Sequence, residues 1–263
     1  MKKVLALTLA IVMVATIAIF AGCGENSTQS NGAEASKDSA KTYVIYSDNA
    51  FAPFEYLDEK TNEYIGVDME IMDAVAKDQG FEYEMHNEGF DASMGAVQAG
   101  QADAMIAGMT ITDERKETFD FSDAYFDDGQ VLVVKPDSDI KSLEDLKDKK
   151  VACKTSTVSG EYAESIKDKY GFEITYFEGS DTMYQAVVTG SADACVEDFS
   201  VIGYAIKDQN VKLNIVTEPV NVKGYGFAVK KGQNAELVEK FNKGLANIKK
   251  SGEYDKILEK YGY

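Results

Sequence analysis

The sequence predicts an α/β protein built from two similar lobes, chiefly because one unit occurs twice. Gly89–Gly108 reads GFDASMGAVQAGQADAMIAG and Gly179–Asp198 reads GSDTMYQAVVTGSADACVED, with eight of the twenty positions identical. Each copy has the pattern of a short helix that follows one strand and leads into a buried strand. Strands alternate with helices along most of the chain, which indicates βαβ units. Two facing lobes would enclose a cleft, and open α/β sheets bind ligands beyond the carboxyl ends of their strands.

Local patterns predict each element in chain order. The first strand is rich in β-branched and aromatic residues, and several later strands are continuous apolar runs, as expected of parallel strands covered on both faces. Strands are predicted at Tyr43–Asp48, Glu82–Asn87, Asp103–Gly108, Gly129–Lys135, Lys150–Thr155, Phe172–Phe177, Asp193–Asp198 and Leu213–Glu218. The first helix carries Ile71 and Val75 on one face, and Ser142 with Asp145 fits a capping box. Helices are predicted at Gly66–Gln79, Asp91–Ala99, Ser142–Asp148, Gly160–Lys169, Asp181–Thr189 and Asp198–Asp208.

The C-terminal part of the chain predicts two helices that must pack on an existing sheet. Asn234–Lys249 and Ser251–Lys260 both carry apolar residues at helical spacing. Since no strand follows them, we expect the preceding strand, Gly224–Lys230, to cross back to the first lobe. The first lobe would then be discontinuous in sequence.

The two chain crossings between the lobes would form a hinge. We expect the first lobe to comprise residues 42–125 and 226–263, and the second lobe to comprise residues 126–225. Gly129, Gly224 and Gly226 lie at the crossings. Glycine suits a segment that must change its backbone angles, although these three could also be ordinary turn glycines.

The N-terminus predicts secretion and lipid anchoring. Two lysines precede an apolar run from Val4 to Ala21, as in a signal sequence. The segment Ile19-Phe20-Ala21-Gly22-Cys23 resembles a bacterial lipoprotein box, in which the cysteine is acylated, for example with palmitate. We expect residues 1–22 to be a lipoprotein signal peptide and residues 23–41 to be a disordered tether, because the tether has little to bury. The alternative is an uncleaved anchor helix.

Composition excludes several classes of function. The formal net charge is −18, which repels phosphate backbones, so we expect no binding to nucleic acid. Cys153 and Cys195 are expected to be small buried residues, with a disulfide as the alternative. The single histidine, His86, lies on a predicted strand without clustered partners, so we expect neither a metal site nor a cofactor.

Two polar residues suggest the chemistry of the cleft. Arg115 follows a buried strand and lies near the start of a short helix that Thr112 could cap. A cation is unfavourable at that end of a helix, whereas a guanidinium matches a carboxylate bidentately. Asp198 ends a strand of the other lobe and could bind an ammonium group. The alternatives are a solvated arginine and a simple N-cap. Facing each other, the two would suit an α-amino acid.

The motifs as a set are similar to one family. They are Asp48-Asn49-Ala50-Phe51-Ala52-Pro53-Phe54-Glu55, Gly66-Val67-Asp68, Ala107 through Arg115, Phe119 through Tyr125, and Ala192-Asp193-Ala194 through Asp198. The chain resembles the extracytoplasmic solute-binding proteins of polar amino-acid ABC importers, most of all their glutamine-binding members. The resemblance implies a periplasmic-binding-protein-like fold of type II, with a ligand cleft between two lobes and a two-segment hinge.

The resemblance also implies roles for individual residues. Phe51 and Phe90 match the aromatic pair around the ligand side chain, and Asp198 matches the acid that binds the α-ammonium group. The α-carboxylate clamp matches the backbone at Gly108 together with Thr110, Arg115 and Thr157. Asp48 and Lys154 match contacts to the distal end of the ligand. This chain departs from the family pattern at Ser156, where members usually have glycine, at Val158, which replaces a small residue, and at Glu197, where glutamine binders tend to have histidine.

These residues favour a polar ligand without deciding which one. Asp48 and Glu197 beside two phenylalanines would suit a cationic side chain, whereas Lys154 together with Asp48 would suit a carboxamide. We therefore expect a binding protein for glutamine, with a basic amino acid as the alternative. The expected partners are a free L-amino acid, the membrane permease of an ABC importer and the membrane itself, and we expect a monomer that catalyses no reaction. A dehydratase-like enzyme that uses Glu197 is the alternative from another class.

Overall fold

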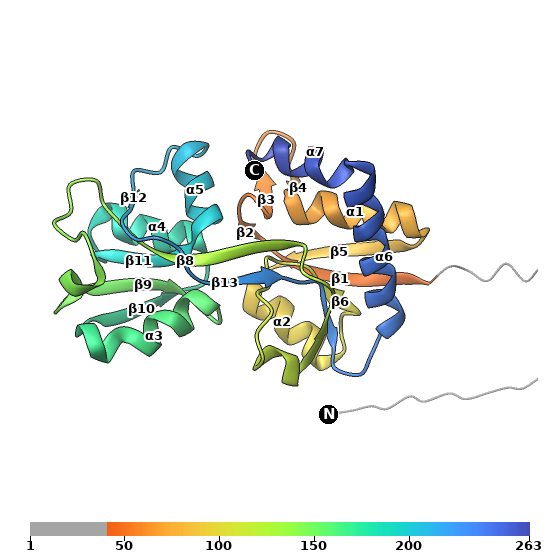
Figure 1. Cartoon of the computed structure of the whole chain (residues 1–263), viewed down its shortest axis with the longest axis horizontal. Coiled ribbons are helices and arrows are strands. Elements are labelled where there is room, and N and C mark those ends of the chain that lie inside the picture. The colour runs from red at the N-terminus through yellow and green to blue at the C-terminus, as the bar shows by residue number, and fades with distance from the viewer. Residues whose placement is uncertain (1–40) are drawn as a thin grey trace, which may run out of the picture. The chain divides into compact units, whose positions relative to one another are not determined.

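The computed structural model of the protein describes residues 41–263 and shows an α/β fold with two lobes (Figure 1). The predicted signal peptide and Cys23 lie outside these residues, as does all of the predicted tether except Lys41. Among the described residues, no helix combines the length and the apolar character needed to cross a membrane.

Each lobe is built on one mixed sheet. The first sheet has the order β5-β1-β6-β14-β7, and the second has the order β10-β9-β11-β8-β12, with β13 paired to β8. The strands of the first sheet are β1 (Thr42–Asp48), β5 (Glu82–Glu88), β6 (Ala104–Met105), β7 (Phe119–Phe121) and β14 (Ala228–Lys230). Those of the second are β8 (Phe126–Val134), β9 (Lys150–Lys154), β10 (Glu173–Phe177), β11 (Ala194–Asp198), β12 (Asn214–Ile215) and β13 (Val220–Tyr225). A small third sheet, absent from the sequence-based expectation, consists of β2 (Ala50–Phe51), β3 (Glu55–Asp58) and β4 (Glu63–Ile65).

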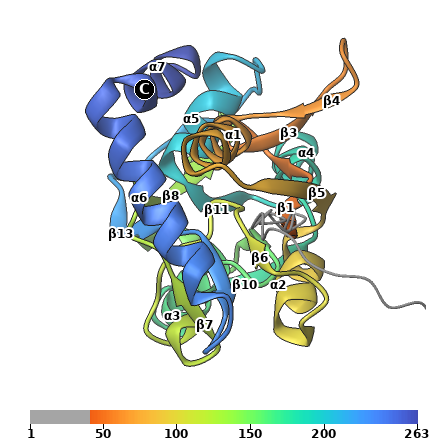
Figure 2. The ribbon, with the colours of Figure 1, turned by 90° about the vertical axis from the view of Figure 1, so that its right-hand side faces the viewer.

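Helices cover both faces of each large sheet (Figure 2). In the first lobe, α1 (Val67–Gln79), α6 (Ala235–Ser251) and α7 (Glu253–Lys260) cover one face, and α2 (Phe90–Ala99) covers the other. In the second lobe, α4 (Ser180–Thr189) and α5 (Phe199–Lys207) lie on one face, and α3 (Val158–Tyr170) lies on the other with a 3-10 turn at Leu143–Leu146. Burial on both faces explains why the central strands lack polar alternation.

The two copies of the repeated unit adopt the same local structure. The helices α2 and α4 both span ten residues, begin after a glycine and end at a left-handed glycine, Gly100 or Gly190. The shared Ala-Asp-Ala then leads into β6 or β11. Its aspartate accepts the backbone N–H of the neighbouring strand, Val44 to Asp103 at 3.0 Å and Lys150 to Asp193 at 2.9 Å. The repeated aspartate therefore has a structural role in each lobe.

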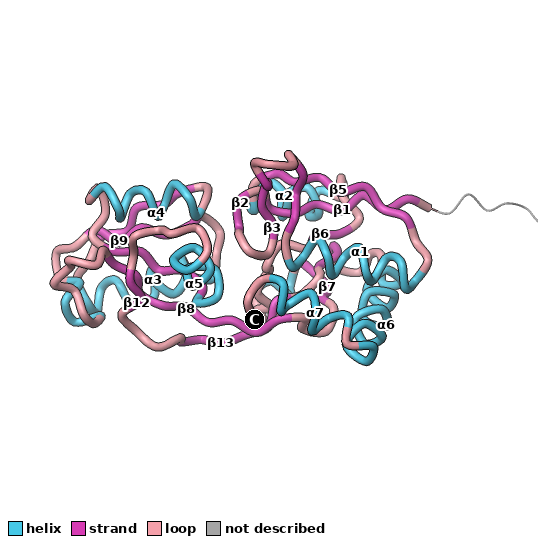
Figure 3. The backbone as a smooth tube through the Cα atoms, turned by 90° about the horizontal axis from the view of Figure 1, so that it is seen from above, coloured by secondary structure: helices cyan, strands magenta, loops and turns pink. Residues whose placement is uncertain are grey.

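Two antiparallel strands, β8 and β13, run between the lobes (Figure 3). Beyond β13 the chain enters β14, which pairs with β6 and β7 of the first sheet, so the C-terminal helices return to the first lobe. We propose the lobe boundaries at residues 125–126 and 225–226 on this basis.

The glycines near the two strands meet a steric demand. A Cβ atom on Gly224 would lie 2.4 Å from the Cβ atom of Ala124, and one on Gly129 would lie 2.7 Å from the carbonyl oxygen of Val220. Neither glycine has a positive φ. Close contact between chain segments therefore explains glycine here without any appeal to backbone freedom.

Several predicted elements differ in length or type. The predicted strand Asp103–Gly108 is limited to β6, since β14 pairs with it only at Met105 and the chain then bends toward Gly108, whose φ is +52°. Leu213–Glu218 is likewise reduced to β12. The capping box at Ser142 is present, but its helix is a single 3-10 turn. The strand β8 pairs antiparallel to β11, which an apolar run alone does not reveal.

Cys153 and Cys195 are buried and free, so the disulfide alternative was wrong. Cys195 pairs in register with Ala152, one residue from Cys153, and successive side chains of a strand point to opposite faces. The two thiols accordingly belong to the hydrophobic clusters on opposite sides of the second sheet.

Candidate functional site

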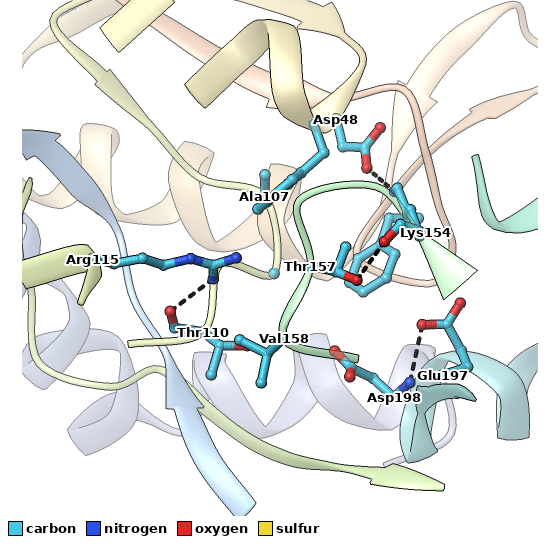
Figure 4. A pocket seen from close by; sticks show the side chains of 12 residues that line it. Asp48, Ala107, Thr110, Arg115, Lys154, Thr157, Val158, Glu197 and Asp198 are labelled. Carbon is cyan, nitrogen blue, oxygen red and sulfur yellow. Dashed lines mark hydrogen bonds and ion pairs between the residues drawn. The ribbon is translucent and has the colours of Figure 1, made fainter. Parts of the chain in front are cut away.

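One pocket between the lobes gathers all the predicted ligand-binding residues (Figure 4). The space between its walls is about 310 Å³, which includes a part that is open to solvent. Its lining comprises Asp48, Phe51, Phe90, Gly108, Thr110, Arg115, Lys154, Thr157, Glu197 and Asp198, together with Ala107 and Val158, which were not among the predicted ligand-binding residues. The first six belong to the first lobe and the next four to the second, so two walls face each other across the space.

Arg115 is a buried cation without an acidic partner. Its exposed fraction is 8%, and none of the ion pairs within residues 41–263 includes it. Nη1 donates to the carbonyl oxygen of Thr110 and Nη2 to that of Ser156, each at 2.9 Å. Burial lowers the pKa of the guanidinium, yet an arginine stays charged in proteins. A buried charge of this kind requires a counter-ion, and two carbonyl contacts leave donors free for one.

The local reason for the position of Arg115 differs from the expectation. Thr112 Oγ1 does accept the Arg115 N–H, at 3.1 Å, but only a single 3-10 turn, Arg115–Glu117, follows. A single turn has little macrodipole, so an unfavourable interaction with a helix dipole does not distinguish Arg115 from other cations. What distinguishes Arg115 is its burial. A simpler sequence signal was also available, because Arg115 is the only arginine in the chain, beside 26 lysines.

Thr110 adds two donors to the same wall. Thr110 and Tyr225 form an isolated antiparallel bridge in which the N–H and C=O groups of Thr110 point away from Tyr225. The carbonyl oxygen of Thr110 accepts a hydrogen bond from Arg115. Neither its N–H nor its O–H donates to another group in the described part of the chain. With Arg115, these groups form a cluster of donors suited to an anion.

The backbone of Gly108 is shared between the pocket and the core. Its N–H donates to Asp68 Oδ2 at 2.8 Å, so only its carbonyl oxygen is available on the pocket side. A side chain cannot replace its hydrogen, because a Cβ atom would lie 2.4 Å from Phe51 Cε1 and φ is +52°. The expectation that the Gly108 backbone donates to a carboxylate therefore does not fit this geometry.

Asp198 forms the opposite wall. It precedes α5, but its carboxylate makes no capping hydrogen bond, so the simple N-cap alternative was wrong. Oδ1 accepts from Gln130 Nε2 at 3.1 Å and from Ser159 Oγ at 2.9 Å, and Oδ2 accepts from the Tyr225 hydroxyl. A carboxylate offers about four acceptor sites, so three donors hold this one in place and leave capacity for a cation.

Glu197 lies beside Asp198 and is held by its own lobe. Oε2 accepts from Ser180 Oγ at 2.8 Å and from the Tyr184 hydroxyl at 2.9 Å, and Oε1 accepts the Asp198 N–H at 2.9 Å. Burial, with the charge of Asp198 as the next cause, raises the pKa of Glu197 to about 7.

Asp48 and Lys154 pair with each other across the lobes. Asp48 ends β1 and Lys154 ends β9, and their side chains are each 2% exposed. The Lys154 ammonium also lies 4.8 Å from the ring centroid of Phe51 and 5.9 Å from that of Phe90. The cation that faces the aromatic pair is thus supplied by the protein itself.

The loop between β9 and α3 contains the departure from the family pattern at Ser156. Ser156 has a φ of +58°, a conformation that favours glycine, and its hydroxyl donates to Asp91 of the first lobe at 2.8 Å. Thr157 caps α3 by accepting the Gly160 N–H and donates to the Lys154 carbonyl oxygen. Its hydroxyl is therefore already used in two hydrogen bonds within the second lobe.

Comparison with known proteins decides the family. The model of the bacterial extracellular solute-binding proteins, family 3, matches residues 43–263. The chain belongs to this family. The resemblance inferred from the motifs and the two-lobed fold class are both confirmed.

Individual relatives of this family 3 protein bind different solutes. The ABC transporter glutamine-binding protein GlnH of Bacillus subtilis is 36% identical over an alignment of 276 positions that covers 99% of this chain and 97% of GlnH. A probable histidine-binding protein of Neisseria gonorrhoeae is 36% identical over 224 residues, covering 84% and 83%. An ancestral arginine-binding protein, 40% identical over 84% of this chain, has been solved with arginine (TM-score 0.78, 98% covered) and with glutamine (0.77, 97% covered).

The two lobes of this family 3 protein contact each other directly across the pocket. Substrate-binding domain 2 of GlnP from Lactococcus lactis, solved in an open conformation, is 42% identical over 84% of this chain and 94% of its own. Its TM-score is only 0.61, below that of the less identical ancestral protein with its ligand. The contacts of Arg115 with Ser156 and of Asp48 with Lys154 join the lobes directly.

Sequence reasoning missed the residues that hold the pocket from behind. Gln130 and Tyr225 belong to the two strands between the lobes, and Ser159 belongs to α3. All three donate a hydrogen bond to Asp198. No spacing in the sequence indicates this shared role, because the three positions come together only when β8, β11, β13 and α3 meet.

Proposed function

We propose that the protein binds one free α-amino acid in the pocket between its lobes. The observation that carries the proposal is a buried guanidinium without an acid on one wall and a carboxylate with spare capacity on the other. A zwitterion can be buried there because each of its charges meets a partner. The α-carboxylate would meet Arg115 and Thr110, and the α-ammonium group would meet Asp198 and the carbonyl oxygen of Gly108.

The distal end of the pocket favours a neutral polar side chain, and we propose glutamine as the ligand. A guanidinium between Phe51 and Phe90 would meet the Lys154 ammonium that already lies against both rings. A carboxamide instead needs one donor and one acceptor, which Lys154 and Asp48 supply as a pair. GlnH and the glutamine-bound ancestral protein support this choice, whereas the arginine-bound form favours the basic alternative.

Titration calorimetry with glutamine, glutamate, histidine, arginine and lysine tests the ligand. Glutamine should bind most tightly. Tighter binding of arginine or lysine would replace glutamine with the basic alternative while leaving the amino-acid site in place. No heat with any of the five would contradict the site itself.

Replacement of Arg115 by alanine tests the carboxylate clamp. Truncating one partner of a buried charge pair costs about 2–5 kcal/mol, so the Arg115→Ala variant should bind at least about 30-fold more weakly. Lys116→Ala is the matched control, because the neighbouring Lys116 is exposed and pairs only with Asp113 within residues 41–263. Near-normal affinity in Arg115→Ala, with the control also unchanged, would contradict the assignment.

The transport role follows from the family and is part of the proposal. Closed lobes would present a surface that an open form lacks to the permease of an ABC importer. We propose that Cys23 carries the lipid that retains the protein, as a monomer, on the outer face of the membrane. A Cys23→Ser variant should then appear in the culture medium, and retention of that variant on the cells would contradict the anchor.

Catalysis is not part of the proposal. The dehydratase alternative requires a reactive acid at Glu197, but both oxygens of Glu197 already accept hydrogen bonds from the second lobe. The family is one of solute-binding proteins.

A further inference from the structure

Buried acids outnumber buried bases in the described part of the chain. Two basic side chains, Arg115 and Lys154, are buried within residues 41–263, and Lys154 is paired with Asp48. The buried acids are Asp48, Glu55, Asp68, Asp128, Glu197 and Asp198. Isolated buried charges are too costly to persist, so some of these carboxyl groups must be paired or protonated.

Three of the acids, Asp128, Glu197 and Asp198, form one connected group that we call the carboxylate triplet. The Asp198 N–H donates to Glu197 Oε1 at 2.9 Å. The Tyr225 hydroxyl donates to Asp198 Oδ2 and lies 3.3 Å from Asp128 Oδ2. All three residues are 7% exposed or less. Glu197 and Asp198 line the second-lobe wall of the pocket, and Asp128 is connected to them through the Tyr225 hydroxyl.

The surroundings of the triplet contain many hydrogen-bond donors but little positive charge. Asp128 faces Ser200 of α5, Tyr225 of β13 and, at the C-terminus, Tyr263. Glu197 faces Ser180 and Tyr184 of α4.

Positive charge reaches the triplet only from a distance. Glu197 is attracted electrostatically by the ammonium of Lys154 on β9, and Asp198 is attracted by the guanidinium of Arg115 across the pocket. No ion pair within residues 41–263 includes any of the three acids.

Like charges this close together in a buried site cannot all be ionised at modest cost. Burial, followed by the charge of Asp198, raises the pKa of Glu197 to about 7 and that of Asp128 to about 6. The triplet therefore holds a proton over part of the range between pH 5 and pH 8 while no cation is bound. The ammonium group of an amino acid beside Asp198 would be the missing cation.

We propose that the α-ammonium group of the bound amino acid displaces a proton from the carboxylate triplet, so that binding releases a proton to the solvent and weakens in acid. The inference rests on the proposed amino-acid site. The charge change balances, since the ligand keeps its own proton and the triplet gives one to the buffer. The released proton comes from Glu197 or Asp128.

The sign of the pH dependence follows from linkage. A group whose pKa falls when ligand binds makes the affinity rise with pH between its bound and free pKa values. One released proton changes the dissociation constant by at most tenfold per pH unit. We expect the dissociation constant to increase severalfold from pH 8 to pH 6.

Calorimetry in two buffers with different ionisation enthalpies, phosphate and imidazole, measures the proton directly. L-glutamine is the probe, or L-arginine if the ligand panel ranks it first, since neither has a group that titrates between pH 6 and pH 8. The apparent enthalpies should differ between the buffers at pH 6.5 by an amount that corresponds to a large fraction of one released proton, and they should converge near pH 8. Equal enthalpies at pH 6.5 would overturn proton coupling but not the amino-acid site. No binding in either buffer would overturn the site.

Substitutions identify the source of the proton. Glu197→Gln and Asp128→Asn remove one titrating group each with little change in size, and proton release should fall in one or both. Asp127→Asn is the matched control, because Asp127 is the exposed neighbour of Asp128 and should leave the release as in the unaltered protein. A Glu197→Gln, Asp128→Asn double variant that binds and still releases the same number of protons would overturn the proposal. If the double variant does not fold, the two single variants decide in the same way.

Discussion

At the scale of single residues, Glu55 and Asp68 form a second buried acid pair behind the pocket. Both are fully buried, and three of their four oxygens have no hydrogen-bond partner within residues 41–263. Asp68 Oδ2 accepts from the Gly108 N–H and from the Tyr125 hydroxyl, each at 2.8 Å. A proton on Glu55 would satisfy the pair, because Glu55 could then donate to Asp68. Burial is the first cause that raises the pKa of Glu55 well above its usual value and that of Asp68 to about 6.

The pair predicts that stability falls as pH rises. An acid with a raised folded pKa stabilises fully below its unfolded pKa, about 4.3 for Glu, and this contribution is lost as pH rises toward the folded value. Between those limits the slope is up to about 1.4 kcal/mol per pH unit. Glu55→Gln keeps a donor without a titrating proton, so the difference in unfolding free energy between the two proteins should change between pH 5 and pH 8.

Urea unfolding at several pH values measures this difference. Glu59→Gln is the control, because Glu59 is exposed on the same segment. Parallel stability curves for Glu55→Gln and the unaltered protein would show that Glu55 does not carry the proton.

At the scale of elements, the pair β8 and β13 serves both the fold and the pocket. These two strands connect the lobes, and they also carry Asp128, Gln130 and Tyr225, which hold or adjoin Asp198. The aromatic ring of Tyr225 lies 5.1 Å from that of Phe54 and 6.0 Å from that of Phe126, measured between centroids. A change in the spacing of the strands should therefore reach the pocket.

Gly224→Ala tests this spacing. Its new methyl group would lie 2.4 Å from the Cβ atom of Ala124, and overpacking of this kind costs about 1–3 kcal/mol of stability. The amino-acid affinity should fall as well, because Tyr225 follows directly. Gly203→Ala is a control that should raise the stability instead of lowering it. Gly203 lies within α5 with no atom near its added carbon, and alanine is favoured in a helix by about 0.5–1 kcal/mol. Thermal unfolding and calorimetry measure both variants, and a stable, fully active Gly224→Ala would refute the argument.

Sequence patterns predicted most elements, and they failed where a partner decides the outcome. The internal repeat correctly indicated two related units, since helix periodicity and buried strands are local properties. The short strands β6 and β12 and the antiparallel β8 were not predictable, because ladder length and direction depend on a neighbour remote in sequence. The sheet of β2, β3 and β4 was missed for the same reason.

At the scale of the whole molecule, contacts outside the pocket also join the lobes. The hydroxyl groups of Tyr56, on β3, and Tyr204, on α5, lie 3.1 Å apart. Ser156 donates to Asp91 at 2.8 Å. These contacts exist only while the lobes are closed, so they should add to the affinity for any ligand that closes them.

Tyr56→Phe measures this contribution. A neutral hydrogen bond is worth about 0.5–1.5 kcal/mol, so binding should weaken by roughly 2- to 10-fold while the thermal stability of the ligand-free protein stays nearly constant. Adding Tyr204→Phe should change little further, since the bond is already lost. Tyr64→Phe is the control, because the Tyr64 hydroxyl makes no hydrogen bond within residues 41–263. An unaltered dissociation constant for Tyr56→Phe would show that the contact does not contribute to closure.

The sequence by itself determined the two related lobes, the family, and the residue types that line the pocket, because periodicity, internal repetition and motif order are properties of a single chain. Tertiary structure alone decided how those residues are used. Lys154 pairs with Asp48, the Gly108 N–H turns to Asp68, Thr157 caps its helix, and Asp198 is held by strands that lie far apart in the chain. The physical reason is that hydrogen bonds and buried charges depend on distance in space, and distance in sequence does not determine it.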